Sequence, residues 1–127
     1  MKNLLLILLL VSSASLSLGQ TTDSLKIKLS KEWNIKGYER FGVIDEPSAE
    51  QKNDKVSFKP DNSCSIRENG KNYSGTWSID KTKTYIMCSL SGGIKRNYKI
   101  ISVKNKEAII EYQTPDLIRT KYHLEVK

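Results

Sequence analysis

Apolar and polar residues alternate one by one along most of the chain beyond residue 30. This is the period of a β-strand with one buried face. The clearest example covers residues 72–79, where Tyr73, Gly75, Trp77 and Ile79 fall on one face and polar residues on the other. The pattern predicts a strand at this position, with the side chain of Trp77 directed inward.

The same alternation, bounded by turn residues such as Gly, Pro, Asn and Asp, predicts eight strands. Their expected bounds are 32–41, 55–59, 63–68, 71–79, 84–90, 96–103, 108–113 and 117–126. Asn69-Gly70 is a two-residue hairpin signal, because both positions tolerate a positive φ. Helix is expected at most as a short turn within 21–31, where Leu25 and Leu29 are four residues apart.

Short connections join these strands in meander order, except for a long polar loop over residues 45–54. The order predicts an all-β fold, an eight-stranded antiparallel up-and-down β-barrel. Such a barrel is just wide enough to be filled by side chains or to hold one small ligand. A two-sheet sandwich is the alternative, and the short sequential hairpins favour the meander. We expect a bulge near Gly37, where Tyr38 and Phe41 leave the alternation.

Residues 1–19 have the pattern of a secretory signal peptide. Lys2 precedes an apolar run of eight residues at 4–11, and small residues at Ser17 and Gly19 suit cleavage before Gln20 or within one or two residues of it. A membrane span needs about 20 apolar residues. We therefore expect cleavage, a mature domain over 20–127, a periplasmic or extracellular location, and no stable membrane insertion.

The chain carries a formal charge of +7, and +6 remains once the leader with Lys2 is removed. Its lysines are dispersed along the sequence, and no run reaches the five or six like charges that mark an interaction tail. Many fall on polar strand positions or in turns. The pattern is typical of a solvated surface in which lysines protect strand edges from aggregation. Export also argues against nucleic acid as a partner.

Three short motifs resemble the small lipocalin-like domains of exported bacterial proteins. They are Leu29-Ser-Lys-Glu-Trp33, Phe58-Lys-Pro-Asp61 and Gly75-Thr-Trp-Ser-Ile-Asp80, with a long loop after the first strand. The resemblance covers roughly residues 25–126. It implies a calycin-type barrel that can enclose a hydrophobic cavity, and it implies no defined activity.

The chain departs from the usual lipocalin start at two positions. Lys31 occupies the place of the glycine in the Gly-x-Trp motif. By strand parity Arg119 points outward, so it does not take the place of the arginine that usually closes over the tryptophan. Both departures weaken the expectation of an open-mouthed ligand carrier.

The inward positions contain several large side chains that can line a ligand pocket. The candidates are Trp33, Tyr73, Trp77, Ile86, Tyr98, Tyr112 and Tyr122. The alternative is that they simply fill the core at ordinary packing density. A ligand, if one is bound, is expected near Trp77 and under the loop over 44–54.

Cys64 and Cys88 are disulfide candidates, because export favours oxidised cysteines. Simple hairpins place both cysteines opposite Gly75, on either side of it. Two strand spacings are about 9.5 Å, whereas a disulfide needs Cα atoms within about 7 Å. A bond therefore requires strong coiling at Gly75 or a shifted register. Two buried thiols packed as small apolar residues are the alternative.

No residue set in the sequence suggests catalysis, a metal or a cofactor. His123 is the single histidine and falls on an outward position, and serines occur in no Gly-x-Ser-x-Gly elbow. Two functions remain. The first is an exported lipocalin-like binding protein that holds a small hydrophobic or amphipathic ligand in the barrel. The alternative is a closed-barrel protein–protein interaction module, such as an inhibitor or envelope accessory, with no small ligand.

Overall fold

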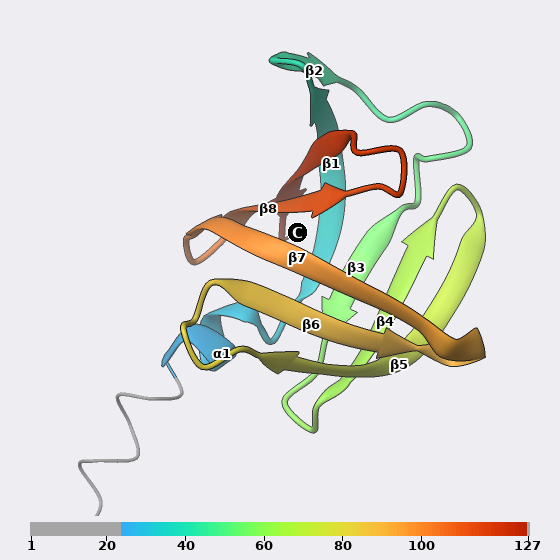
Figure 1. Cartoon of the computed structure of the whole chain (residues 1–127). Helices are drawn as coiled ribbons and strands as arrows, with labels where there is room; N and C mark the ends of the chain where they lie inside the picture. Colours follow the sequence, from blue (N-terminus) through green and yellow to red (C-terminus); the bar gives the residue numbers. More distant parts are fainter. Residues whose placement is uncertain (1–23, 127) are drawn as a thin grey trace, which may run out of the picture.

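The computed structural model describes residues 24–126, which form one antiparallel sheet with a short helix at its start (Figure 1). The predicted signal peptide lies outside this range. The elements are α1 (Ser24–Leu29), β1 (Glu32–Arg40), β2 (Val43–Asp45), β3 (Lys55–Phe58), β4 (Ser63–Glu68), β5 (Lys71–Ile79), β6 (Tyr85–Leu90), a 3-10 turn (Ser91–Gly93), β7 (Ile94–Val103), β8 (Glu107–Gln113) and β9 (Arg119–Glu125).

The sheet closes on itself because β1 pairs with the last strand as well as with its neighbours β2 and β3. Pairing of β1 with β9 runs from Asn34 opposite Glu125 to Glu39 opposite Lys121. Eight strands, β1 and β3 to β9, therefore form the closed barrel in simple up-and-down order. The predicted barrel is confirmed, and the sandwich alternative is excluded. The bulge expected near Gly37 is also present, as a register shift between Ile35 and Gly37.

The ninth strand, β2, was not expected. The predicted strand over 32–41 ends at Arg40, and the chain turns back at Phe41 and Gly42, whose φ angles are 53° and 78°. A two-residue turn with two positive φ angles matches the twist of a hairpin. Phe41 gives no turn signal in the sequence, so residues 43–45, which end where the predicted long loop begins, were not recognised as β2, which pairs with the end of β1.

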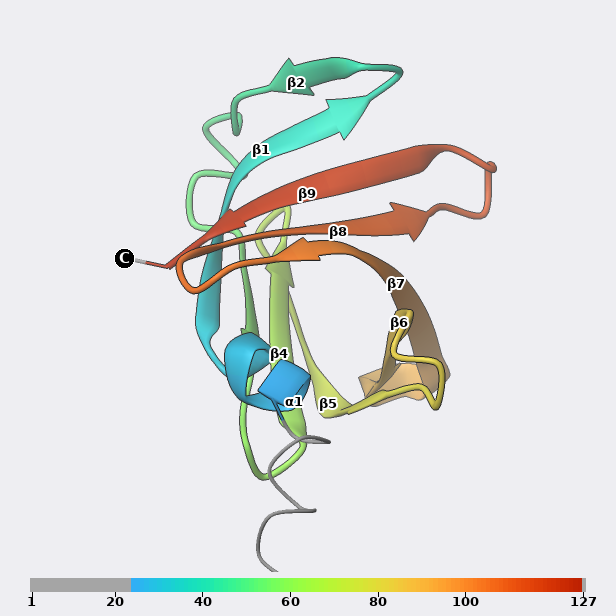
Figure 2. The same ribbon diagram turned by 90° about the vertical axis from the view of Figure 1, so that its left-hand side faces the viewer.

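Successive strands run in opposite directions, so the connections gather at two ends of the barrel (Figure 2). One end holds α1 and the turns over 59–62, 80–84 and 104–106, and we call it the α1 end. The other holds the segment 41–54 and the turns at Asn69-Gly70, Ser91–Gly93 and 114–118, and we call it the mouth. The predicted Asn69-Gly70 hairpin is confirmed, with both φ angles positive.

Apolar side chains fill the barrel beside α1. Leu29, Trp33 and Phe58 are each at most 1% exposed. The indole Nε1 of Trp33 donates to the carbonyl of Leu29 at 3.0 Å, and Nε1 of Trp77 donates to the carbonyl of Lys59 at 2.8 Å. Both tryptophans thus bury their rings without leaving a donor unpaired. We call Leu29, Trp33, Phe58 and Trp77 the apolar cluster.

Gly75 forms a sharp corner of the sheet. The first part of β5 pairs with β4 up to Thr76, whereas its second part, from Gly75 onward, pairs with β6. A Cβ atom at Gly75 would lie 1.9 Å from the carbonyl oxygen of Ser89 and 2.9 Å from Cα of Leu90. Only glycine allows the two backbones to approach this closely.

Candidate functional site

The interior toward the mouth contains a charged pair, Glu68 and Arg96. Nη1 of Arg96 donates to Oε2 of Glu68 at 2.5 Å, and the two side chains are only 14% and 20% exposed. The guanidinium also lies over the rings of Tyr73 and Tyr112, at 5.2 Å and 5.1 Å from their centroids. Arg96 therefore links strands from opposite parts of the barrel wall.

Buried tyrosines complete this group. The hydroxyl of Tyr122 donates to Oε1 of Glu68 at 3.2 Å, and Nη1 of Arg96 donates to the hydroxyl of Tyr98 at 3.4 Å. Burial raises the pKa of both Tyr98 and Tyr122, and the negative charge of Glu68 raises that of Tyr122 further. Both hydroxyls therefore stay protonated over the ordinary pH range. We call Glu68, Arg96 and the tyrosines Tyr73, Tyr98, Tyr112 and Tyr122 the tyrosine cluster.

Asp54 fastens the long loop to the mouth. Its side chain is 2% exposed, and Oδ2 accepts from the hydroxyl of Tyr38 at 2.6 Å and from the amide of Asn69 at 3.1 Å. Burial and the neighbouring Asp54 raise the pKa of Tyr38. The loop over 46–54 is therefore tied both to β1 and to the turn between β4 and β5.

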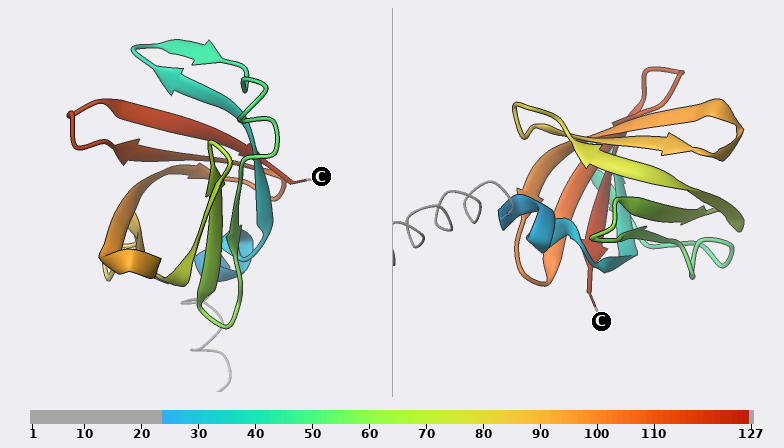
Figure 3. Two further views of the ribbon diagram at one scale, coloured as in Figure 1. Left: turned by 90° about the vertical axis from the view of Figure 1, so that its right-hand side faces the viewer. Right: turned by 90° about the horizontal axis from the view of Figure 1, so that it is seen from below.

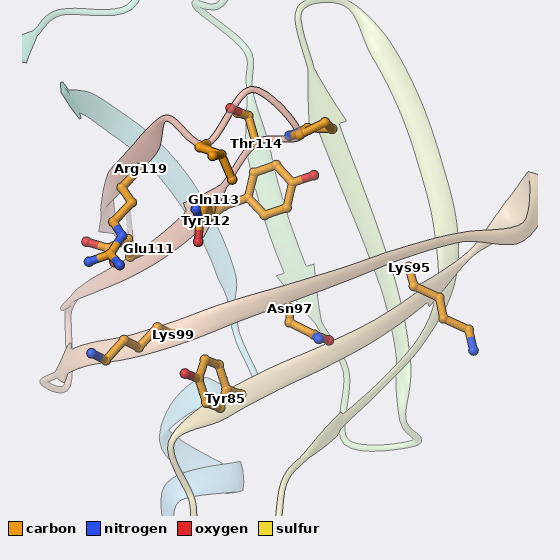
Figure 4. A pocket seen from close by; sticks show the side chains of 11 residues that line it. Tyr85, Lys95, Asn97, Lys99, Glu111, Tyr112, Gln113, Thr114 and Arg119 are labelled. Atoms are coloured by element: carbon orange, nitrogen blue, oxygen red, sulfur yellow. The ribbon is translucent and has the colours of Figure 1, made fainter.

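The barrel wall opens between β7 and β8. The two strands pair from Val103 opposite Ala108 to Lys99 opposite Glu111 and no further. Beyond that point β7 follows β6 and β8 follows β9, so the two hairpins diverge (Figure 4). The opening has a volume of about 520 Å³ and is lined by Tyr85, Lys95, Asn97, Lys99, Glu111, Tyr112, Gln113, Thr114, Pro115, Leu117 and Arg119.

The opening combines three cations and one carboxylate, that of Glu111, with apolar surface. Lys95, Lys99 and Arg119 stand on its rim, and none of them forms an ion pair within residues 24–126. Tyr112 connects it to the tyrosine cluster, since its ring lies 5.7 Å from that of Tyr98. Leu117 is 75% exposed at the edge. These groups suit a small molecule with an acidic group and an apolar body.

A solved structure, that of a lipocalin-like protein from Bacteroides uniformis ATCC 8492, has the same fold. It superposes with a TM-score of 0.57 at 16% sequence identity, over 79% of this chain and 99% of the other. The barrel has the lipocalin-like fold. At this identity the likeness establishes the fold alone, and no protein-family model and no curated protein matches the sequence.

Within this lipocalin-like barrel the seven predicted pocket residues all lie in or against the core, in two groups. Trp33, Trp77 and Ile86 are at most 2% exposed and fill the interior. Tyr73, Tyr98, Tyr112 and Tyr122 surround the Glu68–Arg96 pair, and only Tyr112 also lines the opening.

The structure does not bring Trp77 together with the loop over 44–54, under which a site was expected. The amide of Trp77 donates to the carbonyl of Asn62 in the turn between β3 and β4, at the α1 end. The loop lies at the mouth, where Asp54 contacts Tyr38. The two features are thus at opposite ends of the lipocalin-like barrel.

The predicted register of the cysteines was correct for one and wrong for the other. Cys64 lies opposite Gly75, but Cys88 lies opposite Trp77, because β6 is shifted by two residues. The cause is Asp80, whose Oδ1 accepts from the backbone amides of Thr84 and Tyr85, at 2.8 Å and 2.9 Å, and closes a longer loop. A shift of two residues preserves the face, so Cys88 still points inward.

Both thiols are free and buried in the structure. Burial raises the pKa of Cys64, and burial together with the adjacent Cys64 raises that of Cys88. Cys64 lies opposite Gly75 and Cys88 opposite Trp77, so the two side chains face each other across β5. The disulfide stays a prediction, with two packed thiols as its alternative.

Two residues of the tyrosine cluster were not singled out from the sequence. Glu68 falls two positions after the inward Ile66, and Arg96 two positions before the inward Tyr98. Strand parity places both charges inside the barrel. Among residues 24–126 no three His, Cys, Asp or Glu side chains are grouped as metal ligands, and no helix is long and apolar enough to cross a membrane.

Proposed function

We propose that this chain is an exported, non-catalytic binding protein that takes a small amphipathic anion in the opening between β7 and β8. The observation that carries the proposal is the divergence of these strands beyond Lys99 and Glu111. It produces a cavity of about 520 Å³, which is within the usual range for small-molecule sites. Export is supported by the signal-like sequence of residues 1–19, and the intact mass of protein from the envelope or medium tests cleavage before Gln20.

The opening is a better site than the centre of the barrel. Trp33, Phe58 and Ile86 occupy the interior beside α1 and are almost fully buried. Toward the mouth the Glu68–Arg96 pair crosses the interior. A ligand at the centre would have to displace packed rings or separate a partly buried ion pair, and both changes are costly.

The chemistry of the opening favours an anion with an apolar body. Lys99 and Arg119 come from the two diverging hairpins and can bind one acidic group between them. Tyr112 and Leu117 offer apolar surface beside it. One acidic group and one ring or short alkyl chain would satisfy both kinds of surface.

Titration with the fluorescent anion anilinonaphthalene sulfonate tests the proposal. The Lys99→Gln/Arg119→Gln variant is expected to lower its affinity about tenfold or more. Phenylnaphthylamine, which lacks the sulfonate, should show a much smaller change. The matched control is Lys52→Gln/Lys71→Gln, which removes two exposed lysines that do not line the opening.

Three results would overturn the proposal. They are no binding of the anion to the native protein, equal losses in the variant and its control, or equal losses for both probes.

A second candidate function is supported by the hairpin formed by β1 and β2. Phe41, Val43 and Ile44 are 87%, 58% and 58% exposed, which is unusual for side chains of this kind in one short segment. This hairpin suits a protein partner better than a small ligand. Native mass spectrometry of the protein from its own host separates the two functions. A bound small molecule supports the first, and a protein lost from the Phe41→Ser variant supports the second.

A further inference from the structure

Lysines that are dispersed along the sequence gather at the α1 end of the barrel. The segments 24–31, 59–62, 80–84 and 104–106 contain eight lysines and two aspartates, a net charge of +6 out of +7 for the whole chain. The lysines are Lys26, Lys28, Lys31, Lys59, Lys81, Lys83, Lys104 and Lys106. The remainder of the chain is thus almost neutral, and the charge is concentrated at one end.

Contacts between these segments place them on one continuous surface (Figure 3). A hollow of about 330 Å³ lies between α1 and the turns over 59–62 and 80–84, and its lining includes Lys26, Asn62 and Lys81. Nζ of Lys31 donates to the carbonyl of Asn105 at 2.5 Å, which joins the start of β1 to the turn over 104–106. All four segments therefore belong to one face.

The two aspartates of this face offset only part of its positive charge. None of its eight lysines forms an ion pair with another residue in the described range 24–126. Each of the two aspartates forms hydrogen bonds within its own turn. Asp61 accepts from the amide of Ser63 at 3.0 Å, and Asp80 accepts from the amide of Thr84 at 2.8 Å. Lys31 is engaged by the carbonyl of Asn105 and the ring of Trp33, whereas the other seven lysines form no ion pair within residues 24–126 and can act on an external partner.

One further observation indicates the kind of partner. Ile27 is 67% exposed on α1, between Lys26 and Lys28, so the face also presents an apolar side chain. A membrane surface offers both negative headgroups and an apolar layer.

We propose that the α1 end docks reversibly on the surface of an anionic phospholipid bilayer. The lysines lie over the headgroups, and Ile27 reaches the boundary of the acyl chains. The charges come from four separate segments and cover a whole end of the barrel. This distribution matches a planar surface better than a single polyanionic strand. The docking face is at the opposite end from the mouth, so it does not depend on the ligand proposed for the opening.

Vesicle binding by the processed protein, with its intact mass verified, tests this docking. Binding is expected to phosphatidylcholine vesicles that contain phosphatidylglycerol, with release at high salt because the interaction is screened. The Lys28→Gln/Lys81→Gln variant should lower the partition coefficient about thirty-fold, from the effect of two lysines near a charged surface. Adding Ile27→Ser to this variant should lower the partition coefficient several-fold further.

The matched control is again Lys52→Gln/Lys71→Gln, which removes the same charge from the mouth end. Equal losses in the two pairs would overturn the proposal, because net charge alone would then explain binding. Equal binding to vesicles without phosphatidylglycerol would do so as well. Binding to a sulfated polysaccharide or to duplex DNA, but not to vesicles, would assign the face to a polyanion and reject the bilayer. Lys28→Gln/Lys81→Gln should leave the affinity for anilinonaphthalene sulfonate unchanged.

Discussion

The apolar cluster beside α1 and the tyrosine cluster toward the mouth lie inside one barrel whose strands share the same alternation, yet their chemistry differs. In the apolar cluster the only polar side-chain atoms of the two tryptophans are satisfied by backbone carbonyls. In the tyrosine cluster Glu68 and Arg96 place two charges inside the barrel, between hydroxyls and aromatic faces. The comparison separates a part of the core that stabilises the fold from a part that tolerates polar groups.

This difference has an energetic reason. Burying a large apolar side chain contributes about 1.5–3 kcal/mol. A buried ion pair contributes little beyond an apolar pair of the same size, because desolvation offsets the attraction. Glu68 and Arg96 are therefore poorly explained by stability alone. They lie next to the wall opening through Tyr112, which is where the proposed ligand would bind.

The largest effect is expected where β5 passes from its pairing with β4 to its pairing with β6. Gly75→Ala places a methyl group against the backbone carbonyl of Ser89, and no side-chain rotation relieves the clash. We expect a loss of about 3 kcal/mol or more in the free energy of unfolding by urea. Ser74→Ala, at the adjacent outward position, should change it by less than about 0.5 kcal/mol. Similar values for the two variants would contradict the close approach at Gly75.

A smaller effect tests the polar half of the comparison. Arg96→Met leaves Glu68 partly buried without its cation, and we expect a loss of about 2 kcal/mol in urea unfolding. The double variant Arg96→Met/Glu68→Leu removes both charges and should lose only about 1 kcal/mol, through the hydroxyls of Tyr98 and Tyr122 left without partners. If the double variant loses the sum of the losses measured for Arg96→Met and for Glu68→Leu alone, the pair is not coupled.

The barrel could be predicted from the sequence because its signals are short-range. Alternation fixes which residues share a face, and Asn69-Gly70 defines a turn by its own conformational freedom. These features depend on neighbours in the sequence, and the structure agrees with each of them.

The remaining features depend on contacts between distant segments. The Phe41-Gly42 turn forms because β2 pairs with β1, although phenylalanine is not a turn residue. Parity places Glu68 and Arg96 inside, but their meeting depends on the curvature of the barrel. The charged α1 end is likewise assembled from four turns, and no single run of the sequence indicates it.

The smallest effect concerns single hydroxyls of the tyrosine cluster at high pH. Burial raises the pKa of Tyr98 and Tyr122 above the usual value of 10.0 and that of Cys88 above the usual 9.0. In the unfolded chain these groups lose their protons near the usual values, whereas in the folded chain they do not. Their contribution to the free energy of unfolding is therefore complete at pH values below the usual pKa. Stability falls as the pH rises above that value.

This decline is measured by urea unfolding in three pH ranges: at neutral pH, between pH 9.0 and 10.0, and above pH 10.0. Tyr122→Phe should cost about 1 kcal/mol at neutral pH through its lost hydrogen bond, and should make the decline above pH 10.0 less steep. If Cys64 and Cys88 are free thiols, the decline begins near pH 9.0. If they are bridged, no thiol ionises and the decline begins near 10.0, so one series tests both the tyrosine cluster and the predicted disulfide. A decline with the same slope in Tyr122→Phe and the parent protein would show that this hydroxyl is not buried as the structure places it.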